Sequence, residues 1–158
     1  MKRTRLRFIW FVIILAVLAS ILLYTRMGST PNIKKNIYSQ WSKEYVVTKD
    51  KLSYIRTTNS KTEDVVLSEA QGYGMVIAVD AAKQGDASSA DFEKLYQYYL
   101  AHRLKDTQLM SWKQTIKDGK SNHEDENNAT DGDLYIAYAL LKAAQQWPKQ
   151  AKDYQAQA

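Results

Sequence analysis

An uncharged apolar segment near the N-terminus constrains this chain more than any other feature. It spans Phe8 to Tyr24, seventeen residues without a charged side chain, and it follows four basic residues in the first seven positions. A transmembrane helix needs about 20 apolar residues, whereas a signal peptide has a shorter apolar core followed by a cleavage site of small residues. The small residues Ala16, Ala19 and Ser20 lie inside the segment and not after it. The pattern favours an uncleaved anchor, with secretion after signal-peptide cleavage as the alternative.

The basic residues predict on which side of the membrane each part of the chain lies. Four lysines and arginines precede the apolar segment, and only Arg26 follows it closely. Cytoplasmic flanks of membrane spans carry the excess of Lys and Arg. We therefore expect a cytoplasmic segment at residues 1–7, a transmembrane signal anchor at 8–24, a flexible linker at 25–32 and an extracellular domain at 33–158.

The net charge of +5 does not indicate a nucleic-acid partner. Five of the 22 basic residues flank the apolar segment, and the other 17 are balanced by 17 acidic residues. An external part without net charge lacks the basic surface that binds phosphate backbones. Cysteine is absent, and His102 and His123 lie in two different segments, an amphipathic helix and an acidic loop. No metal site and no cofactor are expected.

Apolar spacing predicts a helical domain after the linker. Apolar or aromatic residues recur every third or fourth position in several segments, as in helices that pack in pairs. The segment Tyr45 to Thr58 mixes β-branched, aromatic and polar residues, which predicts extended chain or a small hairpin. The polar segment Gln108 to Asn128 predicts a long surface loop. The expected class is all-α, with helices over residues 33–43, 68–84, 92–104 and 130–146 and a short helix after Pro148.

The segment SEAQGYGM, residues 68–75, contains glycines that helix stability does not explain. Gly72 and Gly74 lie within about one turn of Glu69 and Tyr73. Each glycine inside a helix costs about 1 kcal/mol relative to alanine. Glycines in such positions indicate that backbone or a ligand approaches closely.

The segment ATDGDLYIAYALLKAAQQW, residues 129–147, places Asp131 and Asp133 in the first turn of an apolar helix. Acidic residues at a helix start stabilise the helix by complementing its dipole, and Glu69 occupies a similar position in the earlier helix. Taken one at a time, these carboxylates are explained by stability alone. Their joint occurrence is more specific.

Together the two segments resemble the signatures of glycoside hydrolase family 8. The second segment matches the family pattern of Ala, Ser or Thr, Asp, a small residue and Asp, followed by an aliphatic and Leu-rich helix and an aromatic. The first is similar to the family's segment around the catalytic acid and departs from it at Ala70, where the family usually has glycine. The resemblance covers about residue 35 to the end of the chain. It implies a glycosidase of the cellulase or endoglucanase type that inverts the anomeric configuration.

The resemblance also implies roles for single residues. Glu69 matches the proton donor, and Asp131 matches the signature aspartate that holds the sugar at the cleavage point and belongs to the proton-transfer network. Trp112 lies in the polar segment where the family carries a tryptophan that stacks on substrate, and burial beneath the loop is the alternative. Tyr73 and Asp133 are further candidates for substrate contact, with packing as the alternative for Tyr73.

The family fold is an (α/α)6 barrel, and this chain supplies only its N-terminal helices. The resemblance places the catalytic base in the C-terminal half of the family, which this sequence does not include. We therefore expect an incomplete barrel with uncovered apolar helix sides and no activity of the chain alone. A truncated gene product and a barrel completed by a separate C-terminal half both remain open.

Two functions follow from these expectations. The first is hydrolysis of β-1,4-linked polysaccharide, with β-glucan as the leading substrate and chitosan, mixed-linkage glucan or xylan as alternatives. The second is a non-catalytic, membrane-anchored module that binds glycan or a partner protein.

Overall fold

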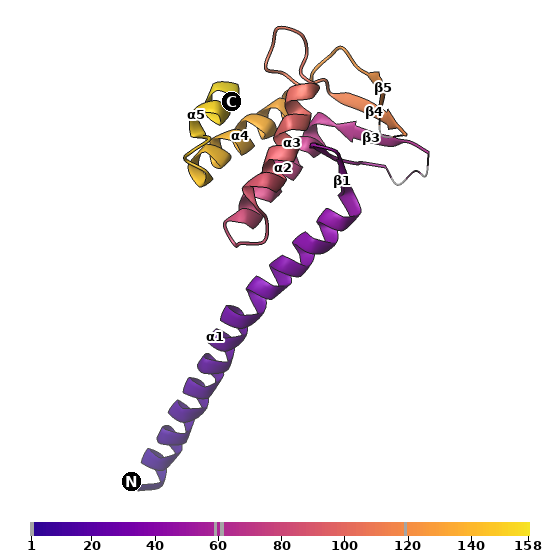
Figure 1. Ribbon diagram of the computed structural model, residues 1–158. Helices are drawn as coiled ribbons and strands as arrows, with labels where there is room; N and C mark the ends of the chain where they lie inside the picture. The colour runs from indigo at the N-terminus through magenta and orange to yellow at the C-terminus, as the bar shows by residue number, and fades with distance from the viewer. Residues whose placement is uncertain (1, 59, 61, 119) are drawn as a thin grey trace. The chain divides into compact units, whose positions relative to one another are not determined.

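The computed structural model describes the backbone of residues 2–58, 60, 62–118 and 120–158, and the side chains of the same residues except 2–6 and 27–31. The chain divides into two compact units, Met1–Ile37 and Tyr38–Ala158 (Figure 1). Each unit is described by itself.

The first unit consists of one helix. Helix α1, Lys2–Tyr45, includes the stretch Arg7–Arg26, whose mean hydropathy is 2.6 and whose residues are all exposed. Among the described residues it is the one helix that is long and apolar enough to cross a membrane, a property that signal sequences share. Residues 25–32, for which the sequence predicted a flexible linker, continue helix α1 without a break.

The second unit begins with the end of α1 and a two-stranded hairpin. Strands β1 (Val46–Lys49) and β2 (Leu52–Ile55) pair antiparallel, with Val46 opposite Ile55. Asp50 has a φ of 52° in the turn, a conformation that aspartate tolerates better than most residues. The hairpin predicted within Tyr45 to Thr58 is therefore confirmed.

Helices α2 to α5 lie in the second unit. Helix α2 spans Ser68–Ala82, α3 spans Ser89–Ala101, α4 spans Thr130–Gln146 and α5 spans Ala151–Gln157. Helix α3 starts with a capping box, in which the Ser88 hydroxyl accepts from the Asp91 N–H and the Asp91 carboxylate accepts from the Ser88 N–H.

A three-stranded sheet corrects the all-α expectation. Strands β3 (Asp64–Leu67), β4 (Lys113–Lys117) and β5 (Lys120–Glu124) pair antiparallel in the order β3-β4-β5. Two of these strands occupy the segment Gln108 to Asn128, so the prediction of a surface loop there is wrong. Gln114 and Ile116 are buried on alternate positions of β4, as in a strand with one covered face. The polarity of Gln114 concealed this period from the sequence pattern.

Two buried glutamines join the sheets to the helices. The Gln71 side chain accepts from the Ile55 N–H at 3.0 Å and donates to the carbonyls of Ser53 at 3.1 Å and Leu95 at 3.0 Å. The Gln114 amide donates to the Ser111 carbonyl at 2.6 Å, and its oxygen accepts from the Tyr98 hydroxyl at 3.3 Å. Buried amides with these partners leave few hydrogen-bonding groups unsatisfied and fix how the elements pack.

The apolar core lies between the helices and is rich in tyrosine. Helices α3 and α5 contribute aromatic rings that contact each other edge to face, such as Tyr96 with Tyr154 at 5.1 Å and Phe92 with Tyr154 at 5.3 Å. The buried hydroxyls have partners: Tyr96 donates to Asp153, and Tyr154 donates to Glu93. Aromatic residues with satisfied hydroxyls supply large apolar area to a small core.

Helices α2 and α4 pack so closely that glycine is required between them. A Cβ placed on Gly72 would lie 2.7 Å from the Cβ of Tyr135 and 3.1 Å from the Ile136 nitrogen, both in α4. The close approach that the sequence predicted for this glycine is therefore confirmed, and its neighbour is the backbone of a second helix. Gly74 faces the side chain of Ile55 in β2.

The substitution Gly72→Ala tests this contact. Alanine favours the helix by about 1 kcal/mol, but overpacking against a neighbouring backbone costs about 1–3 kcal/mol. We expect the free energy of unfolding to fall by up to about 2 kcal/mol, measured by urea unfolding of the full chain in detergent micelles. Gly74→Ala is the matched comparison and should lose less, because the Ile55 side chain can rotate away. A gain in stability for Gly72→Ala would contradict the contact.

Candidate active site

The N-termini of α2 and α4 lie against each other and bring two predicted catalytic carboxylates to one place. A Cβ on Gly132 would overlap the Ser68 side chain and would lie 2.8 Å from the Glu69 backbone nitrogen. Asp131 immediately precedes Gly132, so Glu69 and Asp131 start their two helices at the same end of the pair. The glycine of the second segment is what permits this approach.

The start of α2 is held by backbone and not by a side-chain cap. Ser68 is the first residue of the helix, Leu67 occupies the N-cap position, and no side chain caps the helix. The Ser68 N–H instead donates to the Trp112 carbonyl at 2.9 Å. Backbone next to the β3–β4 pair thus supplies the acceptor that a capping side chain would otherwise provide. Thr130 is likewise the first residue of α4, with Ala129 at the N-cap.

Trp112 joins the site through the same hydrogen bond. It lies directly before β4, whose first residue Lys113 pairs with Leu67 at the end of β3. Its own N–H donates to the Asn127 carbonyl at 2.8 Å. The ring is 37% exposed, and the Lys113 ammonium lies 5.7 Å from the ring centroid. Trp112 is thus an exposed aromatic fixed by its backbone next to the residue before Glu69.

Tyr73 lies one helical turn after Glu69 and is also exposed. Its ring centroid is 4.2 Å from that of Tyr135 in α4. Hydrogen bonding to Tyr135 and partial desolvation raise the pKa of the Tyr73 hydroxyl to about 12, and the Glu69 carboxylate contributes in the same direction. The Tyr73 hydroxyl therefore keeps its proton over the whole neutral range, within electrostatic reach of Glu69.

Asp131 and Asp133 differ in the freedom of their carboxylates. Asp131 is exposed, and one of its oxygens accepts from the N–H of its neighbour Gly132 at 2.8 Å. Both oxygens of Asp133 are engaged: one accepts from the Met110 N–H at 3.0 Å and the other from the Asn128 amide at 2.7 Å. The structure gives Asp133 structural partners that the sequence did not indicate.

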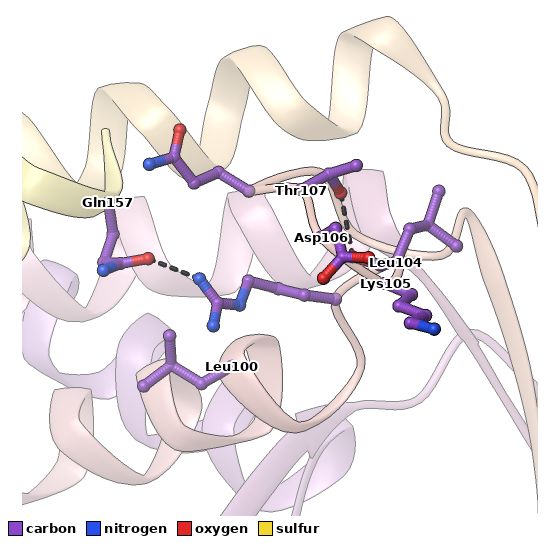
Figure 2. A pocket seen from close by; sticks show the side chains of 8 residues that line it. Leu100, Leu104, Lys105, Asp106, Thr107 and Gln157 are labelled. Atoms are coloured by element: carbon purple, nitrogen blue, oxygen red, sulfur yellow. Dashed lines mark hydrogen bonds between the residues drawn. The ribbon is translucent and has the colours of Figure 1, made fainter.

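The predicted site residues Trp112 and Tyr73 are exposed at the surface. A cavity of about 600 Å³ lies elsewhere, next to the C-terminal end of α3, and is lined by Leu100, Lys105 and Thr107 among others (Figure 2). In it Arg103 donates to the Gln157 side chain at 2.6 Å. None of the five predicted site residues lines this cavity. Asp133 lines a separate cavity of about 370 Å³ together with Asn128 and Leu134. The packing of the two helix N-termini is the observation by which we place the candidate site.

Sequence reasoning missed several residues that shape the site. Tyr135 stacks on Tyr73, and Asn127 and Asn128 hold Trp112 and Asp133. The sequence offered no periodic signal for the two asparagines, because their role depends on a contact between distant segments. In the part of the chain that the structure describes, no group of three or more His, Asp and Glu side chains is arranged to hold a metal ion.

Comparison with known proteins gives one consistent family. The sequence model of glycosyl hydrolases family 8 matches residues 13–158. A beta-glucanase of Niallia circulans is 39% identical over 111 residues, which cover 70% of this chain and 26% of the relative. An endoglucanase of Bacillus sp. strain KSM-330 is 33% identical over 135 residues, which cover 78% of this chain and 28% of the relative. The chain spans about a quarter of the length of these curated relatives.

Solved structures agree with this result. The apo structure of a beta-1,3-1,4-glucanase from Paenibacillus sp. X4 has a TM-score of 0.60 at 30% identity and is matched over 80% of this chain and 35% of its own. The endo-beta-1,4-glucanase CMCax from Acetobacter xylinum has a TM-score of 0.60 at 27% identity and is matched over 81% and 36%. The second unit therefore has the fold of about a third of a family 8 enzyme.

The raised pKa of Tyr73 can be tested directly. We expect the Tyr73 hydroxyl to titrate with a pKa of about 12, followed by ¹³C NMR of labelled tyrosine and assigned with Tyr73→Phe. Tyr135→Phe removes the largest cause, so the pKa should fall towards the ordinary value of about 10. Glu69→Gln removes a smaller cause and should lower it less. An unchanged titration of Tyr73 in Tyr135→Phe would show that the two rings do not interact.

Proposed function

Because the chain belongs to glycosyl hydrolases family 8, we propose that its second unit is the N-terminal part of an (α/α)6 barrel and carries the proton donor of a β-glucan hydrolase. The observation that supports this most is the contact of Gly132 with the backbone of Glu69, because it places the two signature carboxylates at one end of one helix pair. Helix stability explains each acidic helix start by itself but not why the two are neighbours. A shared role in binding or chemistry explains both.

Glycoside cleavage with inversion uses two carboxyl groups about 6.5–9.5 Å apart, one that protonates the departing oxygen and one that activates water. We assign the first role to Glu69. Asp131 is exposed and, apart from the bond to Gly132, can accept hydrogen bonds from sugar hydroxyls. Both oxygens of Asp133 already accept hydrogen bonds from the protein, so we do not assign it the second role. We propose that the base comes from the part of the fold that these 158 residues do not match.

The exposed aromatics suit a sugar substrate. Pyranose rings present flat CH faces, and aromatic side chains bind such apolar faces while their polar groups remain hydrated. Trp112 is 37% exposed, and its carbonyl accepts from the N–H of Ser68, the residue before Glu69. Tyr73 is 41% exposed and follows Glu69 by one helical turn. We propose that both contact the glycan, with the Tyr73 hydroxyl as a hydrogen-bond donor.

The names of the relatives favour β-1,4-linked glucan as the substrate class. They include a beta-glucanase, endoglucanases and an endo-beta-1,4-glucanase. A family 8 xylanase matches at 23% identity and supports the shared fold alone. Chitosan, mixed-linkage glucan and xylan remain alternative substrates.

An exposed apolar stripe on α4 supports the incomplete-barrel proposal. Leu134, Tyr138 and Leu141 lie at spacings of four and three and are exposed by 66%, 52% and 49%. A soluble domain rarely leaves such a helix face open unless another element covers it. The remaining helices of a family 8 barrel, supplied as a continuation or as a separate C-terminal half, would provide that cover.

A non-catalytic module is the second candidate function. A glycan could bind without the base through three exposed residues, Trp112, Tyr73 and Asp131. In this case the anchor would hold the chain at the cell surface with the binding face outside. The two candidates differ in whether Glu69 matters once the barrel is complete.

Variants of Trp112 and Glu69 should differ in how strongly they affect glycan binding. We expect the full chain in micelles to bind cellohexaose, measured by isothermal titration calorimetry, and to release no reducing sugar from β-1,4-glucan. Trp112→Ala should weaken binding roughly tenfold, because stacking contributes about 1 kcal/mol or more. Glu69→Gln should retain binding.

The matched control is Tyr45→Ala, which removes an exposed aromatic on α1. It should leave the affinity unchanged. Release of reducing sugar by the chain alone would show that our assignment of the base is wrong, and equal binding by Trp112→Ala would remove Trp112 from the site.

We propose that the apolar part of α1 is a single-pass signal anchor with the N-terminus in the cytoplasm and the second unit outside, and secretion after cleavage is the alternative. The full chain should remain in the membrane pellet after extraction with alkaline carbonate, because about 20 apolar residues insert stably. Replacing Leu15 and Leu18 with arginine should release it, because each central charge costs about 2.5–3.5 kcal/mol. A shortened, soluble product from the unchanged chain would favour the signal peptide.

A further inference from the structure

Asp133 occupies a position from which one carboxylate controls a long segment. Its two oxygens accept from the Met110 N–H at 3.0 Å and from the Asn128 amide at 2.7 Å. Met110 precedes β4 and Asn128 follows β5, so the two partners lie at the two ends of the β4–β5 hairpin. The carboxylate thereby fastens both ends of the hairpin to the first turn of α4.

The fastened segment leads directly to Trp112 and Glu69. Between the two partners of Asp133, the Trp112 N–H donates to the Asn127 carbonyl at 2.8 Å, which closes the base of the hairpin. The Trp112 carbonyl accepts from the Ser68 N–H at 2.9 Å, which joins that base to the start of α2. Four hydrogen bonds thus connect Asp133 in α4 with the residue before Glu69 in α2.

A carboxylate suits this position better than a neutral residue. It offers two acceptor oxygens to two donors from different segments, and hydrogen bonds to a charged acceptor are stronger than neutral ones. The N-terminal turn of α4 also stabilises the negative charge. Because each oxygen already accepts one hydrogen bond from the hairpin, Asp133 has less acceptor capacity left for a sugar than Asp131.

We propose that Asp133 is a positioning residue that holds Trp112 at the start of α2, bonded to the residue before Glu69, by fixing both ends of the β4–β5 hairpin. As far as it concerns a glycan, this role rests on the proposed function, in which Trp112 binds the sugar that Glu69 protonates. It replaces the expectation that Asp133 itself contacts the substrate. It also separates the two signature aspartates, with Asp131 towards the ligand and Asp133 towards the hairpin.

Amide hydrogen exchange tests the positioning role without any sugar. In full-length Asp133→Ala in micelles, the amides of Met110, Trp112 and Ser68 should exchange roughly tenfold faster or more than in the unchanged chain. Amides of the β1–β2 hairpin should keep their rates. Asn128→Ala is a milder variant that removes one of the two bonds, and it should accelerate exchange at Trp112 by less.

Asp91→Ala is the matched control. Asp91 also lies in the first turn of a helix, and its carboxylate accepts two hydrogen bonds, from the N–H and the hydroxyl of Ser88. Loss of the Asp91 carboxylate should lower stability without selectively accelerating amide exchange at Trp112 or Ser68. Equal effects of Asp133→Ala and Asp91→Ala on these two amides would overturn the proposal.

A reciprocal exchange provides the rescue. In Asp133→Asn combined with Asn128→Asp, the new asparagine still accepts from the Met110 N–H and donates to the new aspartate, so both bonds are retained with one donor reversed. The amide exchange rates of Trp112 and Ser68 should return to within about threefold of their values in the unsubstituted chain. Exchange as fast as in Asp133→Ala would overturn the proposal.

Cellohexaose binding then separates the two claims. If the chain binds cellohexaose, the affinity should fall roughly tenfold in Asp133→Ala and recover in the reciprocal pair, as expected for a ring that has lost its position. If the unchanged chain does not bind cellohexaose but the exchange results hold, the positioning role stands and the glycan-binding function fails. Binding that is unchanged in Asp133→Ala would overturn the role of Asp133 at the site.

Discussion

The close packing of α2 against α4 is the contact on which the rest of the site depends. In the middle of the helix pair, Gly72 of α2 contacts Tyr135 and Ile136 of α4. At the N-terminal end, Gly132 of α4 contacts Ser68 and Glu69 of α2. A side chain at either glycine would separate the helices, because a buried backbone cannot yield as a flexible side chain does. The two glycines therefore explain how two acidic helix starts, 62 positions apart in the sequence, become neighbours.

Strand pairing adds the third component of the site. The β3–β4 pairing places the Trp112 carbonyl where the first N–H of α2 needs an acceptor, so one bond both completes the helix start and locates an aromatic ring. The buried amide of Gln114 attaches β4 to α3, and that of Gln71 attaches β2 to α2. Because the polar groups of these two amides are hydrogen-bonded within the protein, they fix the strands and helices that carry the exposed residues of the site.

In the proposed function, this arrangement supplies the groups that contact a glycan. Glu69 and Asp131 lie at helix N-termini, Tyr73 keeps its proton, and Trp112 presents an exposed ring. These groups can donate and accept hydrogen bonds and pack on a sugar face, which is one side of the chemistry of an inverting glycosidase. In our proposal the catalytic base comes from the rest of the barrel, outside the matched third. The helices of that part would cover the apolar stripe on α4.

Some of this could be predicted from the sequence because it depends on local pattern. The apolar segment Phe8 to Tyr24, the helices with their apolar period and the two family signatures are each contained in one short stretch. The glycines of SEAQGYGM also indicated a close approach, because glycine inside a helix has a cost that some neighbour must explain. The sequence therefore determined the family, most of the helices and the identity of the candidate residues.

Only the tertiary structure decided how those residues are used. The strand β4 was missed because buried Gln114 reads as polar until its partners Tyr98 and Ser111 are known. Asp133 looked equivalent to Asp131, and the difference arises from Met110 and Asn128, which the fold brings to one of them and not to the other. Such roles depend on contacts between distant segments, and a side chain's position in the sequence does not specify which donors will surround it.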